Sequence, residues 1–285
     1  MIRLFAFTTG SDLRLGCERD SRLKDISAAA AAQFGRVALV DRLRAGRLDE
    51  LVTALEQDKP AAADMPAAFA WLPPLPRPGK IVAMVQNYRK HAAEFGNTAP
   101  PAPTWFAKLP SSLTGHEQPI RIPGWVDGRV DHEVELAVVV GKAASSIAEA
   151  EALRHVAGYS VLNDVSARRI QKDDREAKLP WTRCKNFDTF TPMGPWLVPA
   201  RYVPDPQALA ISCRVNGVTR QQSSTAEMIH PVARQLAEMS RWMTLEPGDV
   251  VATGTPEGVN NLKDGDICEC EVAGIGLLRN RVSRS

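Results

Sequence analysis

The first part of the chain carries one strand-like and two helix-like patterns of apolar residues. Apolar and polar residues alternate over residues 2–17, on either side of a Thr9-Gly10-Ser11-Asp12 turn, which predicts a small hairpin. Asp25 leads into an alanine-rich segment, and residues 48–55 place apolar side chains at helical spacing. Together these patterns are typical of a small α+β unit.

A change of composition follows this unit. Residues 59–78 are rich in proline and alanine, which favours a rigid linker whose apolar residues pack on the next domain. A ligand for a proline-recognition module is the rarer alternative for such a stretch. We therefore predict a small amino-terminal domain with its linker over residues 1–75, and a larger domain over residues 76–285.

The larger part is patterned mainly for strands. We predict strands over residues 80–85, 130–141 and 157–164, a hairpin with arms 210–215 and 218–221, a strand from 245 that enters a small-residue loop, and two closing strands after residue 266. Helices are predicted over residues 88–95, 145–153 with a serine cap, 166–172 and 224–243. The last helix would bury a stripe formed by Ile229, Val232, Leu236 and Met239, and His230 is interpreted as structural. The predicted fold class is α+β, mostly β.

Composition and charge argue against several classes of function. The chain of 285 residues has a net charge of +2 without clustered Lys and Arg, so we expect no nucleic-acid partner. The amino terminus lacks a signal-peptide pattern and no apolar run approaches the length of a membrane span, so we expect a soluble cytoplasmic protein with no membrane partner. The five cysteines show no zinc-type spacing, and Cys268 and Cys270 face one side of a strand without a partner pair. We interpret all five as reduced thiols.

Two glutamates lie two residues apart at the start of the strand over residues 130–141. Because side chains alternate along a strand, Glu133 and Glu135 share one face while Val134 and Leu136 share the other. Paired carboxylates repel each other and resist burial unless a cation joins them, and a hard divalent metal suits their oxygens best. Taken alone, an exposed strand with two solvated glutamates is the commoner arrangement.

A third carboxylate makes the metal hypothesis stronger. The short apolar strand over residues 157–164 ends at Asp164, which is followed by a polar, basic turn. Three carboxylates at strand ends would complete an oxygen site for Mg²⁺ or Mn²⁺, with water or substrate in the remaining positions.

Several motifs in this order resemble those of the fumarylacetoacetate hydrolase family. The resemblance runs from about residue 78 to residue 281 and implies a mixed β-sheet roll behind a small amino-terminal α+β domain, with the catalytic domain over residues 76–285. Its metal site is built from a Glu-x-Glu strand and an Asp further on, which correspond to Glu133, Glu135 and Asp164. The motifs are Pro78-Gly79-Lys80-Ile81-Val82, Asn87-Tyr88-Arg89-Lys90-His91, Glu133-Val134-Glu135-Leu136, Gly158-Tyr159 to Arg168, Lys185-Asn186-Phe187-Asp188-Thr189, Gly194-Pro195-Trp196 and Gly248-Asp249 to Gly258.

A histidine and a glutamate form the candidate general base. His91 and Glu94 are three residues apart on the predicted helix, within reach of each other, and a carboxylate beside an imidazole fixes its tautomer and raises its basicity. A surface pair is the alternative for an arbitrary short helix. The resemblance implies instead that this segment is a mobile lid whose His and Glu close over the substrate.

The resemblance also assigns the remaining site residues. It implies that Lys185 is the active-site lysine, and that Arg168 and Gln171, three apart on one helix face, help it to stabilise a developing oxyanion or enolate. It implies that Thr255 binds the carboxylate end of the substrate. The candidate substrate-binding residues are Thr255, Gly254, Tyr88 and Gln86. Two stretches depart from the family pattern: Val85-Gln86, and Cys184 and Asn186 beside the lysine.

The resemblance implies a metal-dependent homodimeric enzyme that acts on a small 2-oxo or 1,3-diketo acid. The leading hypothesis is hydrolysis of a C–C bond in an acylpyruvate or fumarylpyruvate-like acid through a metal-bound enolate. Decarboxylation of an oxaloacetate-like acid, hydration or isomerisation of a 2-oxo-alkenoate, and hydrolysis of a sugar-derived diketo acid are the alternatives within the family. A metal-dependent binder of oxo acids without turnover is the alternative from another class.

Overall fold

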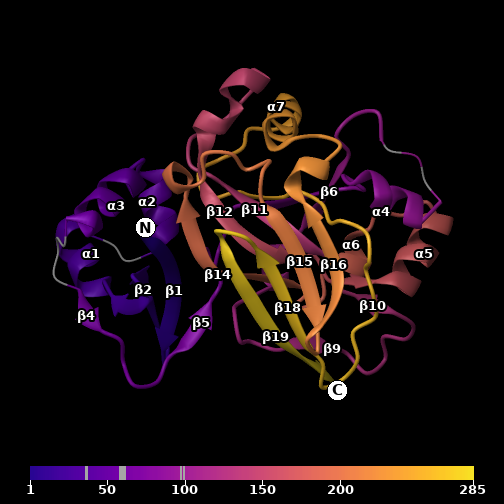
Figure 1. Cartoon of the computed structure of the whole chain (residues 1–285), viewed down its shortest axis with the longest axis horizontal. Helices are drawn as coiled ribbons and strands as arrows, with labels where there is room; N and C mark the ends of the chain where they lie inside the picture. Colours follow the sequence, from indigo (N-terminus) through magenta and orange to yellow (C-terminus); the bar gives the residue numbers. More distant parts are fainter. Residues whose placement is uncertain (36–37, 58–61, 97, 99) are drawn as a thin grey trace.

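The computed structural model describes residues 1–285 except 36–37, 58–61, 97 and 99. Its amino-terminal part is a three-stranded meander covered by helices (Figure 1), with strands β1 (Arg3–Thr9), β2 (Asp12–Arg19) and β3 (Arg22–Asp25) and helices α1 (Ser27–Phe34), α2 (Leu39–Arg44) and α3 (Leu48–Glu56). Strands β1 and β2 pair in antiparallel register from Arg3 opposite Glu18 to Thr9 opposite Asp12, which confirms the predicted hairpin.

The segment predicted as a linker is more ordered than its composition suggests. Residues 59–61 lie outside the described part, but two short strands follow, β4 (Ala63–Asp64) and β5 (Ala70–Leu72). Strand β5 pairs with β1, and the ring of Trp71 lies 4.9 Å from that of Phe5 and 5.4 Å from that of Trp196. The predicted packing of this segment on the following part is therefore confirmed, whereas the domain boundary at residue 75 stays a prediction.

A long mixed sheet runs through the whole molecule. Its strands lie in the order β4-β3-β2-β1-β14-β12-β11-β17-β6-β7, with β5 beside β1 and β8 beside β14. The further strands of this sheet are β6 (Ile81–Met84), β7 (Trp105–Lys108), β8 (Leu113–Thr114), β11 (Val134–Val140), β12 (Val156–Asn163), β14 (Thr191–Pro199) and β17 (Val250–Ala252). The amino-terminal meander joins through one residue pair, Leu4 opposite Leu197.

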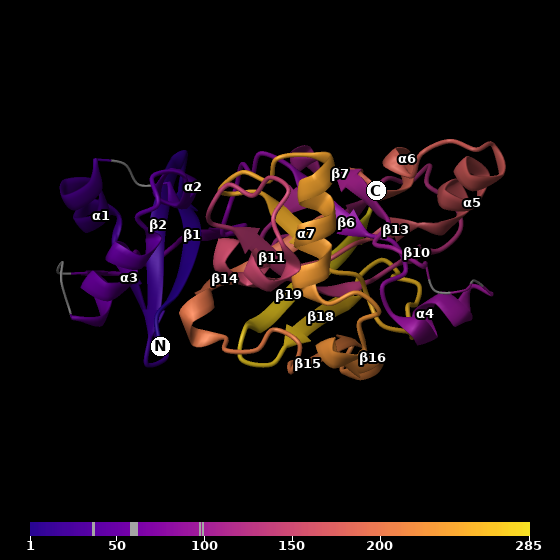
Figure 2. The same ribbon diagram turned by 90° about the horizontal axis from the view of Figure 1, so that it is seen from above.

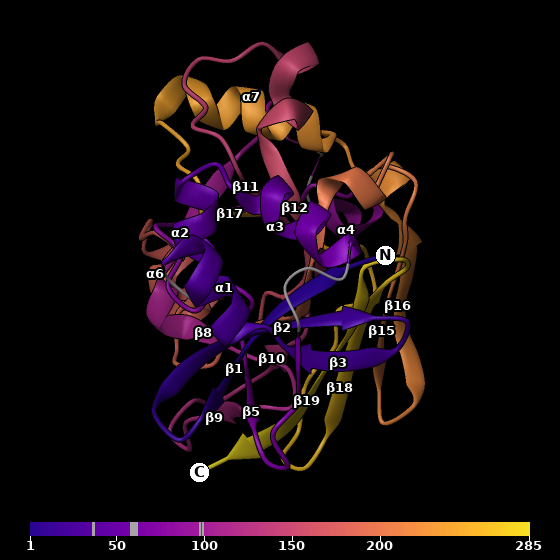
Figure 3. The ribbon, with the colours of Figure 1, turned by 90° about the vertical axis from the view of Figure 1, so that its left-hand side faces the viewer.

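A second sheet packs against this one and closes the main core. Its order is β16-β15-β18-β19-β9, formed by β9 (Ile120–Ile122), β15 (Ala210–Val215), β16 (Val218–Ser224), β18 (Ile267–Val272) and β19 (Gly276–Arg284). Figure 3 shows these strands beside the amino-terminal unit, viewed from its end of the molecule. Val134, Leu136 and Val138 of β11 belong to the core between the sheets, whereas Ala137 and Val139 belong to a second core that includes the amino-terminal unit. The predicted fold class, α+β and mostly β, is confirmed.

The helices of the larger part lie outside the sheets. Helices α4 (Arg89–Glu94), α5 (Arg168–Glu176) and α6 (Thr182–Lys185) gather at the end farthest from the amino-terminal unit (Figure 2). The remaining elements are α7 (Val232–Trp242), the two-stranded sheet of β10 (Val130–Asp131) and β13 (Ser166–Ala167), and the 3-10 turns η1 (Pro110–Ser112), η2 (Glu149–His155), η3 (Ala200–Tyr202) and η4 (Thr225–Glu227). No helix in the described ranges combines the length and the apolar character that a membrane span requires.

Two of the predicted helices were wrong in detail. The stretch 224–243 is interrupted, because Pro231 disfavours a helical conformation at His230 and offers no N–H, so the α-helix begins only at Val232. Val232, Leu236 and Met239 are buried as predicted, and Ile229 is half-buried. His230 makes backbone hydrogen bonds to the amide side chain of Asn87, in keeping with a structural role.

The second error concerns the serine cap. The stretch 145–153 forms the 3-10 helix η2 from Glu149, preceded by an extended Ala148 without a side-chain cap. The Ser146 N–H donates to the carbonyl of Ser240 in α7, so tertiary contact replaces the expected local cap.

Candidate functional site

A cavity of about 540 Å³ opens at the end of the long sheet where α4, α5 and α6 gather. Its wall combines apolar side chains, among them Phe95, Phe106 and Trp181, with a polar set. The predicted site residues that line it are Gln86, His91, Glu133, Glu135, Arg168, Gln171, Lys185 and Thr255. An apolar cavity with a few convergent polar groups is the usual form of a small-molecule site.

Antiparallel pairing of β11 and β12 brings the three candidate metal ligands together. Val134 lies opposite Asn163, so Glu133 and Glu135 flank the strand end that leads into Asp164. The Asp164 N–H also donates to the Glu133 carbonyl over 2.9 Å. One carboxylate oxygen from each of the three lies within 4.8 Å of the others, and all three side chains are buried.

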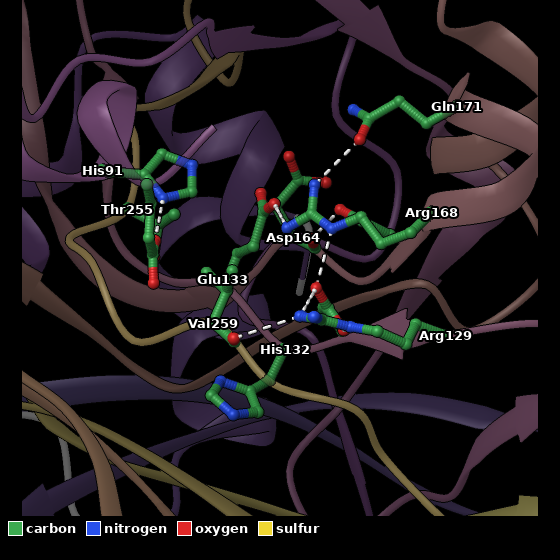
Figure 4. Close-up of polar contacts among 12 residues, drawn as sticks. His91, Arg129, His132, Glu133, Asp164, Arg168, Gln171, Thr255 and Val259 are labelled. Atoms are coloured by element: carbon green, nitrogen blue, oxygen red, sulfur yellow. Dashed lines mark hydrogen bonds and ion pairs between the residues drawn. The ribbon is translucent and has the colours of Figure 1, made fainter. Parts of the chain in front are cut away.

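Cations surround two of these carboxylates. The Lys185 ammonium donates to Glu133 Oε2 over 2.8 Å and to Asp164 Oδ2 over 2.6 Å. Arg168 donates to Glu133 Oε1 over 2.5 Å (Figure 4). Burial alone would raise the pKa of Glu133, but Lys185 and Arg168 hold that pKa well below its ordinary value. Arg168 also donates to Gln171 Oε1 over 2.9 Å, which confirms that these two residues share a helix face.

The sequence interpretation missed two buried residues of this network. Lys108, the last residue of β7, donates to Asp164 Oδ1 over 2.6 Å and to the Lys185 carbonyl over 2.5 Å. Asp131 accepts from Arg168 over 2.8 Å and from Arg129 over 2.7 Å, and thereby anchors Arg168 beside the carboxylates. No spacing along the sequence links either residue to the site. Lys108 ends a four-residue strand, and it meets Asp164 only because distant segments come together in the fold.

Glu135 differs from its neighbours because no cation is paired with it in the described residues. The Gly254 N–H donates to its Oε2 over 2.8 Å. Burial, together with repulsion from Asp164 and Glu133, raises the pKa of Glu135 well above its ordinary value. A divalent cation would remove this penalty, since three converging carboxylate oxygens form a hard, anionic donor set of the kind that Mg²⁺ or Mn²⁺ prefers. The residues present therefore fit a divalent metal.

The predicted histidine–glutamate pair forms on α4. His91 Nδ1 lies 3.1 Å from Glu94 Oε2, and Glu94 Oε1 accepts the Gly258 N–H over 2.8 Å. Although partial burial acts to raise it, hydrogen bonds from His91 and Gly258 lower the pKa of Glu94. An ionised Glu94 accepts a hydrogen bond from Nδ1–H, so the lone pair of the neutral His91 imidazole is on Nε2. The Phe95 ring packs on both His91 and Arg168, at 5.2 Å and 5.0 Å.

Of the four residues predicted to contact the substrate, two line the cavity and two do not. Gln86 and Thr255 line the cavity, and Gln86 adopts a left-handed backbone with φ of 47°, a conformation that is uncommon outside glycine. Tyr88 does not line the cavity; its side chain is 1% exposed and packs in the main core.

Gly254 does not line the cavity either. Its φ of 95° suits glycine, and an added Cβ would lie 2.7 Å from Cβ of Asn87. This close approach directs the Gly254 N–H to Glu135. Gly254 therefore positions a candidate metal ligand, and its predicted contact with the substrate stays a prediction.

Comparison with known proteins shows the family of this chain. Residues 80–283 match the family model described as fumarylacetoacetate (FAA) hydrolase C-terminal. The chain belongs to the fumarylacetoacetate hydrolase family. Enzymes named as hydrolases, isomerases, tautomerases and decarboxylases are found among its relatives.

Three relatives show the breadth of this family. The mitochondrial oxaloacetate tautomerase fahd2 of Xenopus laevis is 41% identical over 220 residues, which cover 74% of this chain and 67% of that protein. The fumarylacetoacetate hydrolase of Exiguobacterium antarcticum has a TM-score of 0.84 and 32% identity, and all of both chains is covered. Maleylpyruvate hydrolase from Sphingobium sp. SYK-6, in complex with manganese(II) and pyruvate, has a TM-score of 0.82 and 33% identity over 99% of each chain.

Proposed function

We propose that this protein is a divalent-metal-dependent hydrolase that cleaves a C–C bond in a small 1,3-diketo acid of the acylpyruvate or fumarylpyruvate type. The observation that carries the proposal is the His91–Glu94 pair at the same cavity as three converging carboxylates. Metal-dependent binding alone needs no general base. The manganese and pyruvate bound to the maleylpyruvate hydrolase neighbour support both the metal and the product class.

The metal would be held by Glu133, Glu135 and Asp164. When bound, Mg²⁺ or Mn²⁺ polarises the carboxylate and 2-oxo oxygens of such a substrate, which makes the adjacent carbon a better electron acceptor. Lys108 and Arg168 hold two of these carboxylates in place, through Asp164 and Glu133.

The chemistry then follows from the side chains. His91, with Nδ1–H held by Glu94, takes a proton from water at Nε2, and the resulting hydroxide attacks the distal carbonyl. The C–C bond breaks, its electron pair passes to the 2-oxo oxygen as an enolate, and the acyl part leaves as a carboxylic acid. Lys185 has one N–H beyond the two given to Glu133 and Asp164 and, with Gln171, would stabilise this enolate. The proton on His91 returns to the enolate carbon to give a pyruvate-like acid.

The outer wall of the cavity favours a substrate with two carboxylates. Residues 168, 171, 172 and 175 of α5 are spaced three and four apart, so they share one helix face, and all of them line the cavity. This face carries two arginines, a lysine and a glutamine. A second anionic group at the distal end of the substrate would meet Lys172 and Arg175, which supports the fumarylpyruvate-like class over a neutral acyl chain.

An oxaloacetate-directed activity is the second candidate. It is favoured by the 41% identity to a protein named oxaloacetate tautomerase, and oxaloacetate is also a dianion. Tautomerisation needs only proton transfer, so it would proceed without the hydrolytic water that His91 activates. Decarboxylation, hydration of a 2-oxo-alkenoate and hydrolysis of a sugar-derived diketo acid use the same enolate chemistry and would be found in the same assay.

The deciding experiment compares substrates under metal control. Purified protein is given fumarylpyruvate, acetylpyruvate and enol-oxaloacetate, each with Mg²⁺, Mn²⁺ or EDTA, and the loss of enol absorbance is followed together with pyruvate formation. Metal-dependent release of pyruvate from a diketo acid would establish the hydrolase. Ketonisation of oxaloacetate without pyruvate would replace it with the tautomerase, and Mn²⁺-dependent ligand binding without any turnover would support a binder. Association as a homodimer stays a prediction that light scattering tests.

A further inference from the structure

Three of the five cysteines come together in the core between the two sheets. Cys213 on β15 lies directly opposite Cys270 on β18, and Cys268 precedes Cys270 by two residues on the same face of that strand. The Sγ atoms of Cys213 and Cys268 are 3.7 Å apart, and those of Cys213 and Cys270 are 3.9 Å apart. All three Sγ atoms lie within 4.8 Å of one another, and each side chain is at most 1% exposed. Cys268 and Cys270 therefore have the partner that their spacing alone did not reveal.

These sulfur–sulfur distances are those of a metal–thiolate centre. A tetrahedral zinc ion binds sulfur at about 2.3 Å, which separates its sulfur ligands by roughly 3.8 Å. Packed thiols without a metal also approach this distance, so the cysteines alone do not decide the matter. The decisive question is whether a fourth donor and a suitable environment are present.

His132 supplies a candidate fourth donor. Its side chain is fully buried, and its Nδ1 lies 2.9 Å from Oε1 of Gln221, the residue opposite Cys213 in the pairing of β15 with β16. Its Nε2 is buried and has no hydrogen-bond partner among the described residues. Figure 4 shows the His132 ring pointing away from the carboxylates and the Arg168 network. A buried imidazole nitrogen without a partner is costly, and coordination of a metal would satisfy it.

The Cys268 sulfur has a polar neighbour that suits a metal-bound thiolate. The Asn163 amide lies 3.5 Å from the same sulfur and donates to it. A thiolate is the form that binds metal, and amide donors around the sulfur are typical supports of such sites.

The geometry points to a second metal centre in this protein, a structural zinc site formed by the thiolates of Cys213, Cys268 and Cys270. The ring nitrogens of His132 are not among the ligand atoms that lie within 4.8 Å of one another, so its Nε2 would complete the site as the fourth ligand after the ring shifts toward the sulfurs. Three thiolates and an imidazole suit Zn²⁺ or another thiophilic ion and do not suit Mg²⁺. All four positions would then be filled by protein, so the role is structural: the ion would join β15 and β18 to the segment that carries Glu133. Because the ligands are buried, the ion would enter during folding and exchange slowly afterwards. This inference does not depend on the proposed catalytic function.

The first test measures the metal in the protein as it is purified. The protein is expressed with zinc in the medium, dialysed against EDTA in the native state and analysed by mass spectrometry for metals. We expect about one zinc per chain after dialysis, released when the protein is unfolded or treated with an organomercurial. Protein grown with Co²⁺ should show intense thiolate-to-cobalt absorption, which oxygen ligands do not produce. Absence of both zinc and this absorption in wild-type protein would overturn the proposal, and this measurement needs no variant.

Variants locate the ion. Cys268→Ser should lower the retained zinc at least tenfold, whereas Cys184→Ser, a buried cysteine outside the cluster, should retain it. His132→Gln should retain sulfur-to-metal absorption but lose zinc to EDTA at least ten times faster. Glu135→Gln, which disables the carboxylate site, should leave the zinc unchanged. Retention of zinc by Cys268→Ser, or its loss from Glu135→Gln, would assign the metal elsewhere and contradict the proposal.

Discussion

Two candidate metal centres lie on opposite faces of one short stretch of chain. Glu133 and Glu135 turn to the cavity, where three carboxylates converge, and His132 turns to the core, where three thiols converge. Both clusters are buried, but their surroundings differ. Lysine and arginine side chains reach the carboxylates from several elements. In contrast, Cys268 and His132 make hydrogen bonds with the neutral side-chain amides of Asn163 and Gln221.

The difference follows from the charge that the carboxylates and the thiols carry when no metal is bound. Carboxylates are ionised at neutral pH, so burying them requires cations, and Glu135, which has none, is pushed toward its protonated form. Thiols are neutral when protonated and can be buried without compensation. The oxygen cluster is therefore suited to exchange its metal beside a substrate, and the sulfur cluster to keep one. The experiments below test this contrast in order of decreasing effect.

Glu135→Gln should separate the two centres most sharply. The amide keeps the size of the side chain and can accept the Gly254 N–H, but it removes the charge that a divalent metal requires. We expect kcat/KM to fall on the order of 10⁴-fold, since metal catalysis contributes several kcal/mol. Stabilisation by Mn²⁺ in thermal unfolding should disappear as well. Glu117→Gln, in an exposed ion pair with Arg279, serves as the control. Full activity of Glu135→Gln in EDTA would refute the role of this carboxylate.

His91→Ala should remove catalysis while leaving the oxygen centre able to bind metal. We expect kcat to fall by about 10³-fold, the usual contribution of a general base, with the Mn²⁺ affinity unchanged within a factor of about three. Stopped assays of pyruvate formation and calorimetric titration with Mn²⁺ measure the two quantities. His155→Ala, outside the cavity, is the matched variant. If His91→Ala cleaved the diketo acid at the wild-type rate, the hydrolytic water would need another base.

Lys108→Met tests whether buried cations hold the oxygen cluster together. The change removes the partner of Asp164 Oδ1 and the donor to the Lys185 carbonyl, and we expect the free energy of unfolding to fall by about 3 kcal/mol. Urea unfolding in EDTA measures it. Lys80→Met, which breaks a partly exposed ion pair with Asp249, should cost about 1 kcal/mol or less. Equal losses of unfolding free energy in the two variants would mean that the buried ion pair of Lys108 contributes no more to stability than the partly exposed ion pair of Lys80.

Metal binding at the carboxylates should release protons. Because the pKa of Glu135 is raised, the metal competes with a proton there, and the affinity for Mn²⁺ should fall about tenfold per pH unit below that pKa and level off above it. In the metal-free protein the free energy of unfolding changes with pH in the opposite direction to the metal affinity. Protonated Glu135 favours the folded state at low pH, and this contribution is lost as the pH rises through the pKa that Glu135 has in the folded protein. Calorimetry in buffers of different ionisation enthalpy counts the protons. A constant affinity between about pH 5 and 8 would show that Glu135 is already ionised.

Arg175→Gln should produce the smallest effect, because Arg175 is an exposed residue of the cavity wall. For a dianionic diketo acid we expect KM to rise about fivefold with kcat unchanged, as for loss of one exposed charge contact of about 1 kcal/mol. For acetylpyruvate, with one carboxylate, KM should stay the same. Arg241→Gln on α7, paired with Glu238 outside the cavity, is the control. An equal change for both substrates would argue against a second carboxylate at this position.

The sequence by itself determined the local parts of the site. Alternation along a strand places Glu133 and Glu135 on one face, and helical spacing joins His91 to Glu94 and Arg168 to Gln171, because these relations depend only on the geometry of a single element. The order of motifs then indicated the family and the fold class, which the comparisons confirm, and it also suggested the role of Lys185, which stays a prediction.

Only the tertiary structure decided which distant segments meet. Lys108 reaches Asp164 across 56 residues, and Cys213 reaches Cys268 across 55, and neither pair shows a spacing that a single strand or helix would produce. The same holds for Tyr88 and Gly254, which the motif order placed at the substrate and the packing directs elsewhere. Register between strands sets such contacts, and it depends on the burial of whole faces and not on the residues that finally touch. For this reason the chemistry of the carboxylate cluster could be predicted from its residues, while its cationic partner Lys108 and the cysteine cluster appeared only in the fold.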